Sequence, residues 1–175
     1  VGLANKFAYA LRFMYSHEAR EKITKLLDQE KIDVVHLHNI YHHITPSILP
    51  VFKARGIPVV MTLHDYKLVS PNYTMYHHGT VHEEDARGWY WSCVKNKCFK
   101  DSRAQSALVT AEMIWHHKIR KYYDTGVAKF IAPSQFIMDT CVRLGQSRDK
   151  FVHIPHPIDA RQWALAPDDA GYVAY

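Results

Sequence analysis

The spacing of apolar residues predicts buried strands that alternate with helices along most of the chain. Four short apolar runs are predicted as strands, at 33–38, 57–63, 127–132 and 151–154. Apolar residues recur at three and four positions between them, which predicts helices after Ser16, over 47–55, from Ser102 to about Tyr123 and over 135–144. This alternation predicts an α/β fold, a Rossmann-like parallel sheet with helices on both faces.

The remaining segments are less regular. Residues 66–101 show no clear period and are predicted as a long, partly ordered loop, a kind of segment that often carries function. Residues 3–14 are predicted as an earlier short helix, 160–170 as a linker and 171–175 as the opening of another strand. The chain is therefore expected to hold one domain over 1–159, followed by a connection to a second.

The composition is that of a globular protein. The chain has 175 residues, of which 47% are hydrophobic and 22% charged. No apolar run reaches the ~18 residues that a membrane span needs, and no signal peptide is recognisable at the start. The three cysteines form an odd set without a C-x2-C pair, so we expect reduced thiols and a cytoplasmic protein.

The positive charge is concentrated in one segment. Residues 93–121 carry seven Lys and Arg against only Asp101 and Glu112, an excess equal to the formal net charge of +5. Such a segment attracts phosphates, anionic lipid or nucleic acid. The simpler interpretation is a solvated helix face.

Polar residues follow each predicted strand. Ligands of open parallel sheets bind beyond the carboxyl ends of the strands. The residues there are His38, Asn39, His64, Asp65, Tyr66, Ser134 and His156. Three histidines at one edge favour a site that positions a sugar hydroxyl or a phosphate, because imidazole donates, accepts or carries a proton near neutral pH. The alternative is that these side chains only cap backbone groups at the strand ends.

These strand ends carry a resemblance to a known family. Asp33-Val-Val-His-Leu-His-Asn39 and Gly56-Ile-Pro-Val-Val-Met-Thr-Leu-His-Asp-Tyr66 resemble the acceptor-side domain of GT-B glycosyltransferases, in the large retaining family numbered four. Segments 69–72, 91–102, 130–136 and 152–159 continue the resemblance in the same order.

The resemblance implies an enzyme that moves a sugar from a nucleotide-sugar to an acceptor with retention at the anomeric carbon. His64 is then expected beside the reacting sugar as the catalytic histidine. The other strand-end residues are expected to line the acceptor side of the cleft. No metal or other cofactor is implied. The acceptor is expected to be a sugar or a lipid-linked sugar of cell-envelope polysaccharide synthesis. The 93–121 segment is then expected to contact the inner face of the plasma membrane.

Two departures from the family pattern matter. Relatives begin with a strand and a glycine-rich turn, and their paired glutamates lie in a second domain that binds the donor. Neither feature is found here, so we expect one incomplete half of a GT-B fold that transfers no sugar alone. A sheet without its first strands has an open edge or face, which predicts marginal stability or self-association.

Two other function classes stay open. A metal-dependent hydrolase would use His36, His38, His64 and Asp65, since residues two apart on a strand point to the same side. Barrel hydrolases need more strands than this chain offers, so His36 is interpreted as a packed core histidine. A non-catalytic module would bind anionic ligands through Trp89–Trp91 and the nearby lysines, although no nucleic-acid-binding motif is present.

A mixed zinc site is a further alternative. Relatives carry extra cysteines before the pair that corresponds to Cys93 and Cys98, so a four-thiolate site is not available here. His77, His78 and His82 would complete a set of nitrogen and sulfur ligands. Because the spacing matches no known zinc pattern, two reduced structural cysteines are the favoured interpretation.

Overall fold

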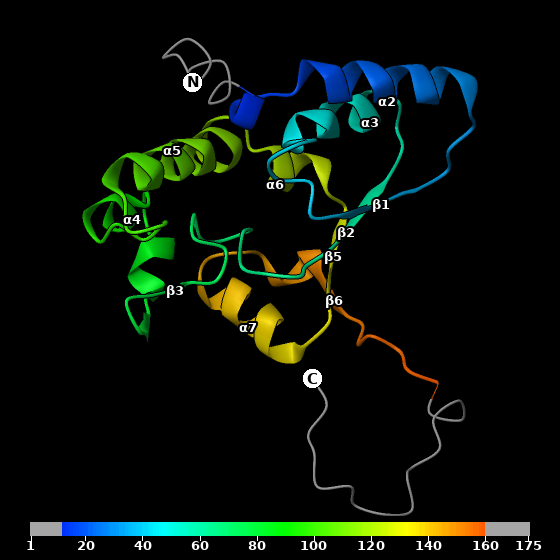
Figure 1. The fold of residues 1–175 in the computed structure, drawn as a ribbon. Coiled ribbons are helices and arrows are strands. Elements are labelled where there is room, and N and C mark those ends of the chain that lie inside the picture. Colours follow the sequence, from blue (N-terminus) through cyan, green and yellow to red (C-terminus); the bar gives the residue numbers. More distant parts are fainter. Residues whose placement is uncertain (1–11, 160–175) are drawn as a thin grey trace, which may run out of the picture.

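The computed structural model describes residues 12–159 and contains a parallel sheet (Figure 1). Its strands are β1 (Val35–His38), β2 (Val59–Thr62), β5 (Lys129–Ala132) and β6 (Phe151–His153), in the order β1-β2-β5-β6. All four predicted strands are confirmed within one or two residues at each end. The predictions for 160–175, and for most of 3–14, lie outside the described residues.

Serine and threonine side chains begin the helices that flank the sheet. The Ser16 hydroxyl accepts a hydrogen bond from the Ala19 amide and begins α2 (His17–Gln29). Thr45 precedes a 3₁₀ turn, η1 (Pro46–Ile48), that leads into α3 (Leu49–Ala54). The Ser134 hydroxyl begins α7 (Gln135–Arg143) by accepting from the Ile137 amide at 3.2 Å. These helices confirm the predicted α/β, Rossmann-like class.

The helix predicted from Ser102 to about Tyr123 is not continuous. It consists of α5 (Arg103–Met113), a π-helical segment η3 (Ile114–Ile119) and a short α6 (Tyr122–Gly126). Lys121 interrupts it with a positive φ of 48°. The interruption turns the chain so that Tyr122 and Tyr123 are buried, and this burial outweighs the local preference for one helix.

The segment 66–101 contains more regular structure than its sequence indicates. It forms a hairpin of β3 (Tyr76–His77) and β4 (Thr80–Val81), a 3₁₀ turn η2 (Glu83–Ala86) and the helix α4 (Trp91–Lys95). Each element is too short to show a period in the sequence. The prediction of a long loop is therefore correct only in part.

A disulfide joins Cys93 and Cys98, so the prediction of two reduced cysteines is wrong. α4 ends between them, and Lys97 adopts a positive φ of 50° that folds the chain back. The two Cα atoms are thereby brought to 4.7 Å, within the range that a disulfide spans. These two cysteines therefore give no support to the expected reducing compartment.

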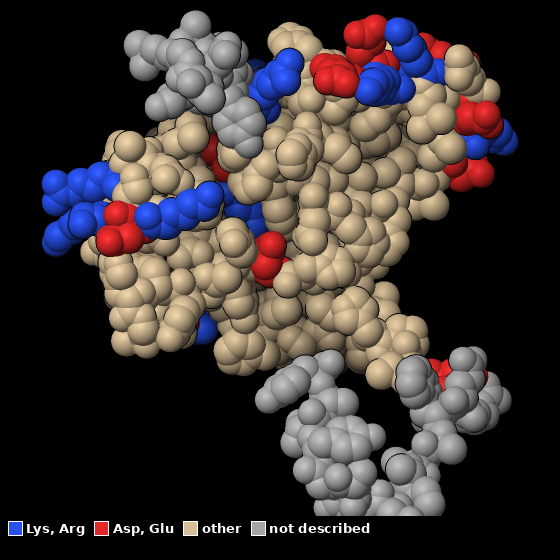
Figure 2. Space-filling model, in the orientation of Figure 1, with Lys and Arg blue, Asp and Glu red and all other residues tan. Residues whose placement is uncertain are grey.

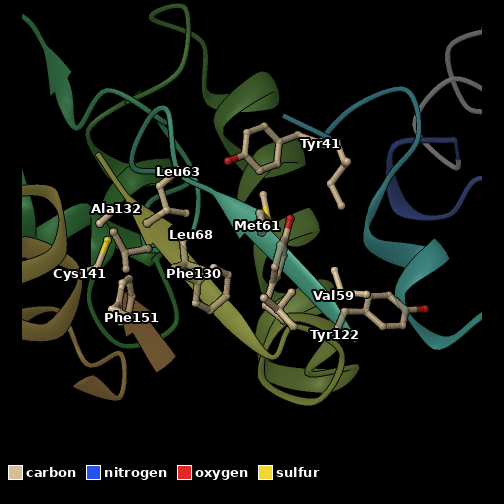
Figure 3. Close-up of a cluster of buried hydrophobic side chains, with 14 of the residues drawn as sticks. Tyr41, Val59, Met61, Leu63, Leu68, Tyr122, Phe130, Ala132, Cys141 and Phe151 are labelled. Carbon is tan, nitrogen blue, oxygen red and sulfur yellow. The ribbon is translucent and has the colours of Figure 1, made fainter. Parts of the chain in front are cut away.

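The two faces of the sheet are covered unevenly. Side chains alternate between the faces, and Val59, Met61 and Phe130 lie in one core cluster with Tyr122 of α6 and Cys141 of α7 (Figure 3). The opposite face carries His36, His38 and Val60 on β1 and β2, and Val152 on β6 is 40% exposed. Within residues 12–159, the helices therefore bury the first face more completely than the second.

Charge on the surface is unevenly distributed. Figure 2 shows Lys and Arg gathered over α4 and α5, whereas α2 carries both signs. The seven Lys and Arg of the 93–121 segment are all exposed. Glu112 is buried, so the surface of this segment is more positive than its sequence indicates. No helix within residues 12–159 has the length and hydropathy to span a bilayer.

Candidate functional site at the strand ends

The parallel strands bring histidines together at their carboxyl ends. His38 is the last residue of β1, His64 follows β2, and His156 follows β6. Nδ1 of His38 lies 2.8 Å from Nε2 of His64, which is a hydrogen bond between the rings. The rings of His64 and His156 are stacked with centroids 6.0 Å apart. The predicted grouping of these three histidines is therefore what the fold produces.

His36 extends the group by one ring. Its centroid lies 4.3 Å from that of His38, and its Nε2 is 2.7 Å from Oγ1 of Thr62. His36 is exposed, so its interpretation as a packed core histidine is wrong. The reason is that its face of the sheet is the less covered one. We call His36, His38, His64 and His156 the histidine row.

The histidine row disfavours positive charge at its centre. Loss of hydration lowers the pKa of His38, and the neighbouring His36, His64 and His156 lower it further. A neutral His38 places one proton between its Nδ1 and Nε2 of His64, so one nitrogen donates and the other accepts.

Asp65 has a structural role in the turn after β2. Its Oδ1 accepts hydrogen bonds from the hydroxyl of Tyr41, at 3.2 Å, and from the amide of Lys67, at 2.8 Å. Burial raises the pKa of Tyr41, and the Asp65 carboxylate adds to this effect. Asp65 thus fixes the loop that carries His64.

The other predicted residues make no side-chain hydrogen bond to the histidine row within residues 12–159. The Ser134 hydroxyl is used as the cap of α7. Tyr66 is half-buried, and its amide donates to the carbonyl of Tyr73 at 2.8 Å. Asn39 is exposed at the end of β1 with a positive φ of 43°. For Ser134 the capping alternative is therefore the one that the geometry shows.

A buried ion pair behind the strand ends was not predicted. Nζ of Lys67 lies 2.8 Å from Oε2 of Glu112, and these side chains are 3% and 1% exposed. His42 and His116 approach the other carboxylate oxygen at 3.8 and 3.7 Å. The i, i+4 spacing of Glu112 and His116 is visible in the sequence, but their burial and their partner Lys67 are not.

A cavity of about 650 Å³ lies beside the amino end of α2. Apolar side chains of Phe13, Ile23 and Ile44 line it together with Arg12 and the ion pair of Lys22 and Glu18. Its walls include residues 42–44, which follow β1, so it opens near the carboxyl edge of the sheet.

The geometry supports neither metal alternative. Within residues 12–159, no three His, Cys, Asp or Glu side chains are arranged to hold a metal ion. His36 is hydrogen-bonded to Thr62. The sulfur atoms of Cys93 and Cys98 are bonded to each other and do not act as thiolates.

Comparison with known proteins gives one informative result. The model of a family described as Glycosyltransferase Family 4 matches residues 5–162, which is most of the chain. No curated protein and no solved structure matches the sequence.

Proposed function

Because the chain belongs to glycosyltransferase family 4, we propose that it supplies the acceptor side of an enzyme that transfers a sugar from a nucleotide-sugar with retention. The observation that carries this proposal is the histidine row at the carboxyl ends of the strands, where ligands of such sheets bind. Residues 1–159 form the acceptor-side domain in this proposal, and a second domain after them binds the donor.

His64 is proposed as the residue that touches the reacting sugar. Its Nε2 is occupied by His38, so Nδ1 is the ring atom left for a substrate. When His38 donates a hydrogen bond to Nε2, a neutral His64 carries its proton on Nδ1. That N–H group then donates a hydrogen bond to a sugar hydroxyl. The contribution of His64 is then positioning, and charge on the departing phosphate is stabilised by donors of the second domain.

The cavity beside α2 is proposed to receive part of the acceptor. Its apolar walls suit a hydrocarbon or a sugar face, and Arg12 suits a negative charge, whereas Lys22 is paired with Glu18. A lipid-linked acceptor has both properties. Neither a metal nor another cofactor enters this proposal.

The test uses the product of the complete reading frame that contains this chain. His64→Ala should lower sugar transfer about 100-fold or more, because loss of a positioning group misplaces the substrate. His78→Ala is the matched control, since His78 is an exposed histidine of the β3–β4 turn, and it should leave the rate unchanged. Circular dichroism checks that both variants fold.

Three results would count against this proposal. An unchanged rate in His64→Ala removes His64 from the reaction. Inversion at the anomeric carbon, read from the NMR spectrum of the product, removes the retaining mechanism. Transfer by residues 1–175 alone removes the need for a donor-binding domain.

We also propose that the basic segment 93–121 contacts an anionic membrane peripherally. Its Lys and Arg side chains are exposed, and its one buried acid pairs with Lys67. Sedimentation with anionic vesicles should show binding at low salt that is lost at high salt. Absence of binding at low salt contradicts the membrane contact but leaves the sugar transfer untouched.

A further inference from the structure

A second cavity lies away from the histidine row and has a basic lining. Its volume is about 380 Å³, and it is bounded by the 66–101 segment, η3 and the end of α7. Each of these three parts contributes one cation, namely Arg87, Lys118 and Arg143. No acidic side chain is among its lining residues.

The cations of this cavity are only partly neutralised. Glu83 pairs with both arginines: its Oε2 is hydrogen-bonded to Arg143 and lies 3.9 Å from Arg87. Lys118 has no carboxylate within ion-pair distance among the described residues, and its Nζ lies 5.4 Å from the ring centroid of Tyr90. Burial raises the pKa of Tyr90, and the Asp124 carboxylate, which is not among the lining residues, raises it further. The two arginines therefore share one carboxylate, which is not among the lining residues, and Lys118 pairs with none of the described carboxylates.

The neighbouring groups suit an oxyanion. Guanidinium groups bind phosphate through parallel N–H donors, and a lysine ammonium adds a point charge. Gln146 also lines the cavity and brings an amide that donates. Tyr90 is buried, and its pKa is raised to about 12 by burial and by Asp124, so its hydroxyl stays protonated at neutral pH.

We propose that the Arg87–Lys118–Arg143 cavity binds a phosphate group. The volume exceeds that of one phosphate, so it also admits part of the molecule that carries the group. This inference goes beyond the proposed sugar transfer, because the cavity shares no residue with the histidine row or with the cavity beside α2.

Two sources of that phosphate are consistent with the surface around the cavity. Trp89 and Trp91 flank Tyr90 in the sequence and are 55% and 66% exposed. Exposed tryptophans favour the interface of a bilayer, where lipid headgroups carry phosphate. A soluble phosphorylated molecule offers the same group.

In the first experiment, isothermal titration calorimetry measures the binding of inorganic phosphate to the purified chain at constant ionic strength. Wild type should bind, and Arg143→Gln should weaken binding about tenfold or more because a charge-assisted hydrogen bond is lost. Lys118→Gln should weaken it similarly. Lys118 forms no ion pair with a described residue, so loss of binding in this second variant cannot be assigned to loss of the Glu83 pairing.

Arg148→Gln is the matched control. Arg148 is 56% exposed and pairs with one carboxylate, Asp139, much as Arg143 is 50% exposed and pairs with Glu83. It does not line the cavity, so phosphate binding should be unchanged. Equal loss in Arg148→Gln and Arg143→Gln, or no binding by wild type, overturns the proposal.

The second experiment separates the two sources with vesicles of phosphatidic acid in phosphatidylcholine. A headgroup source predicts vesicle binding that weakens in Lys118→Gln and is displaced by inorganic phosphate. A soluble source predicts that glycerol 3-phosphate binds in solution while vesicle binding is the same in both proteins. Vesicle binding that is equal in both, with no binding of either soluble phosphate, overturns the proposal.

Discussion

The buried pair of Lys67 and Glu112 makes a sharp prediction about stability. Lys67→Met removes the ammonium and leaves a carboxylate that is 1% exposed without its cation. Breaking a buried pair from one side costs about 3–5 kcal/mol, because the remaining charge stays desolvated. A domain of this size has a total stability of about 5–15 kcal/mol, so one substitution should remove a large share of it.

The double variant Lys67→Met/Glu112→Leu distinguishes charge from packing. Both charges are then absent, and apolar groups of similar volume fill the space. Replacement of a whole buried pair in this way is about neutral or stabilising. The double variant should therefore be more stable than Lys67→Met alone. The two substitutions should show strong coupling, since the side chains are in direct contact.

Urea unfolding followed by tryptophan fluorescence measures these differences. With an m value of about 2 kcal/mol per molar urea, a loss of about 4 kcal/mol lowers the midpoint by about 2 M. Lys22→Met is the matched control: Lys22 pairs with Glu18 at 2.7 Å, but both side chains are more than two-thirds exposed. Its midpoint should hardly change.

One result would refute this reasoning. If Lys67→Met and the double variant have the same midpoint, Glu112 does not carry an uncompensated charge in the single variant. A midpoint of Lys67→Met equal to that of Lys22→Met leads to the same conclusion. Either outcome would mean that, without Lys67, water hydrates the carboxylate or the nearby His42 or His116 takes up a proton and pairs with it.

Three further predictions concern stability. Reduction of the Cys93–Cys98 disulfide should cost about 2 kcal/mol through the entropy of a five-residue separation, and urea midpoints with and without reductant test this. Burial lowers the pKa of His116, so the unfolded chain binds its proton more readily. The contribution of neutral His116 to the free energy of unfolding should be complete above the ordinary histidine pKa of about 6.5, and it should be lost as the pH falls below that value. Equal urea midpoints at pH 5.5 and 7.5 would contradict this. Ser134→Ala should cost about 1 kcal/mol through loss of the α7 cap, whereas Ser147→Ala removes no side-chain cap bond and should cost less in the same assay.

The strand ends were predictable because they depend on local pattern and on one rule of topology. Val35–His38 and Val59–Thr62 are short and apolar, and parallel pairing then places His38 beside His64. The exposure of His36 was not predictable in the same way. It depends on what covers its face of the sheet, and a strand pattern does not carry that information.

The contacts that sequence reasoning missed are distant along the chain or depend on backbone turns. Lys67 and Glu112 are 45 positions apart, and each alone resembles an ordinary surface residue. The Cys93–Cys98 pairing depends on the positive φ of Lys97, which a lysine rarely adopts. In both cases tertiary burial decides the outcome, and propensity gives no signal.

These missed contacts have a consequence for the predicted site. The loop that carries His64 is held at Asp65 by the Tyr41 hydroxyl and the Lys67 amide, and Lys67 is in turn held by Glu112 of α5. The position of His64 therefore depends on an ion pair buried behind the sheet edge and not on β2 alone.

Sugar transfer that relies on positioning is sensitive to displacements of about 1 Å, so the Lys67–Glu112 pair should matter to the transfer rate as well as to stability. The double variant Lys67→Met/Glu112→Leu distinguishes an effect on rate from an effect on stability. It is expected to restore stability without restoring the Lys67–Glu112 contact. A rate that stays low in a stable double variant would show that the pair positions His64, and a rate that recovers with stability would show that it only supports the fold.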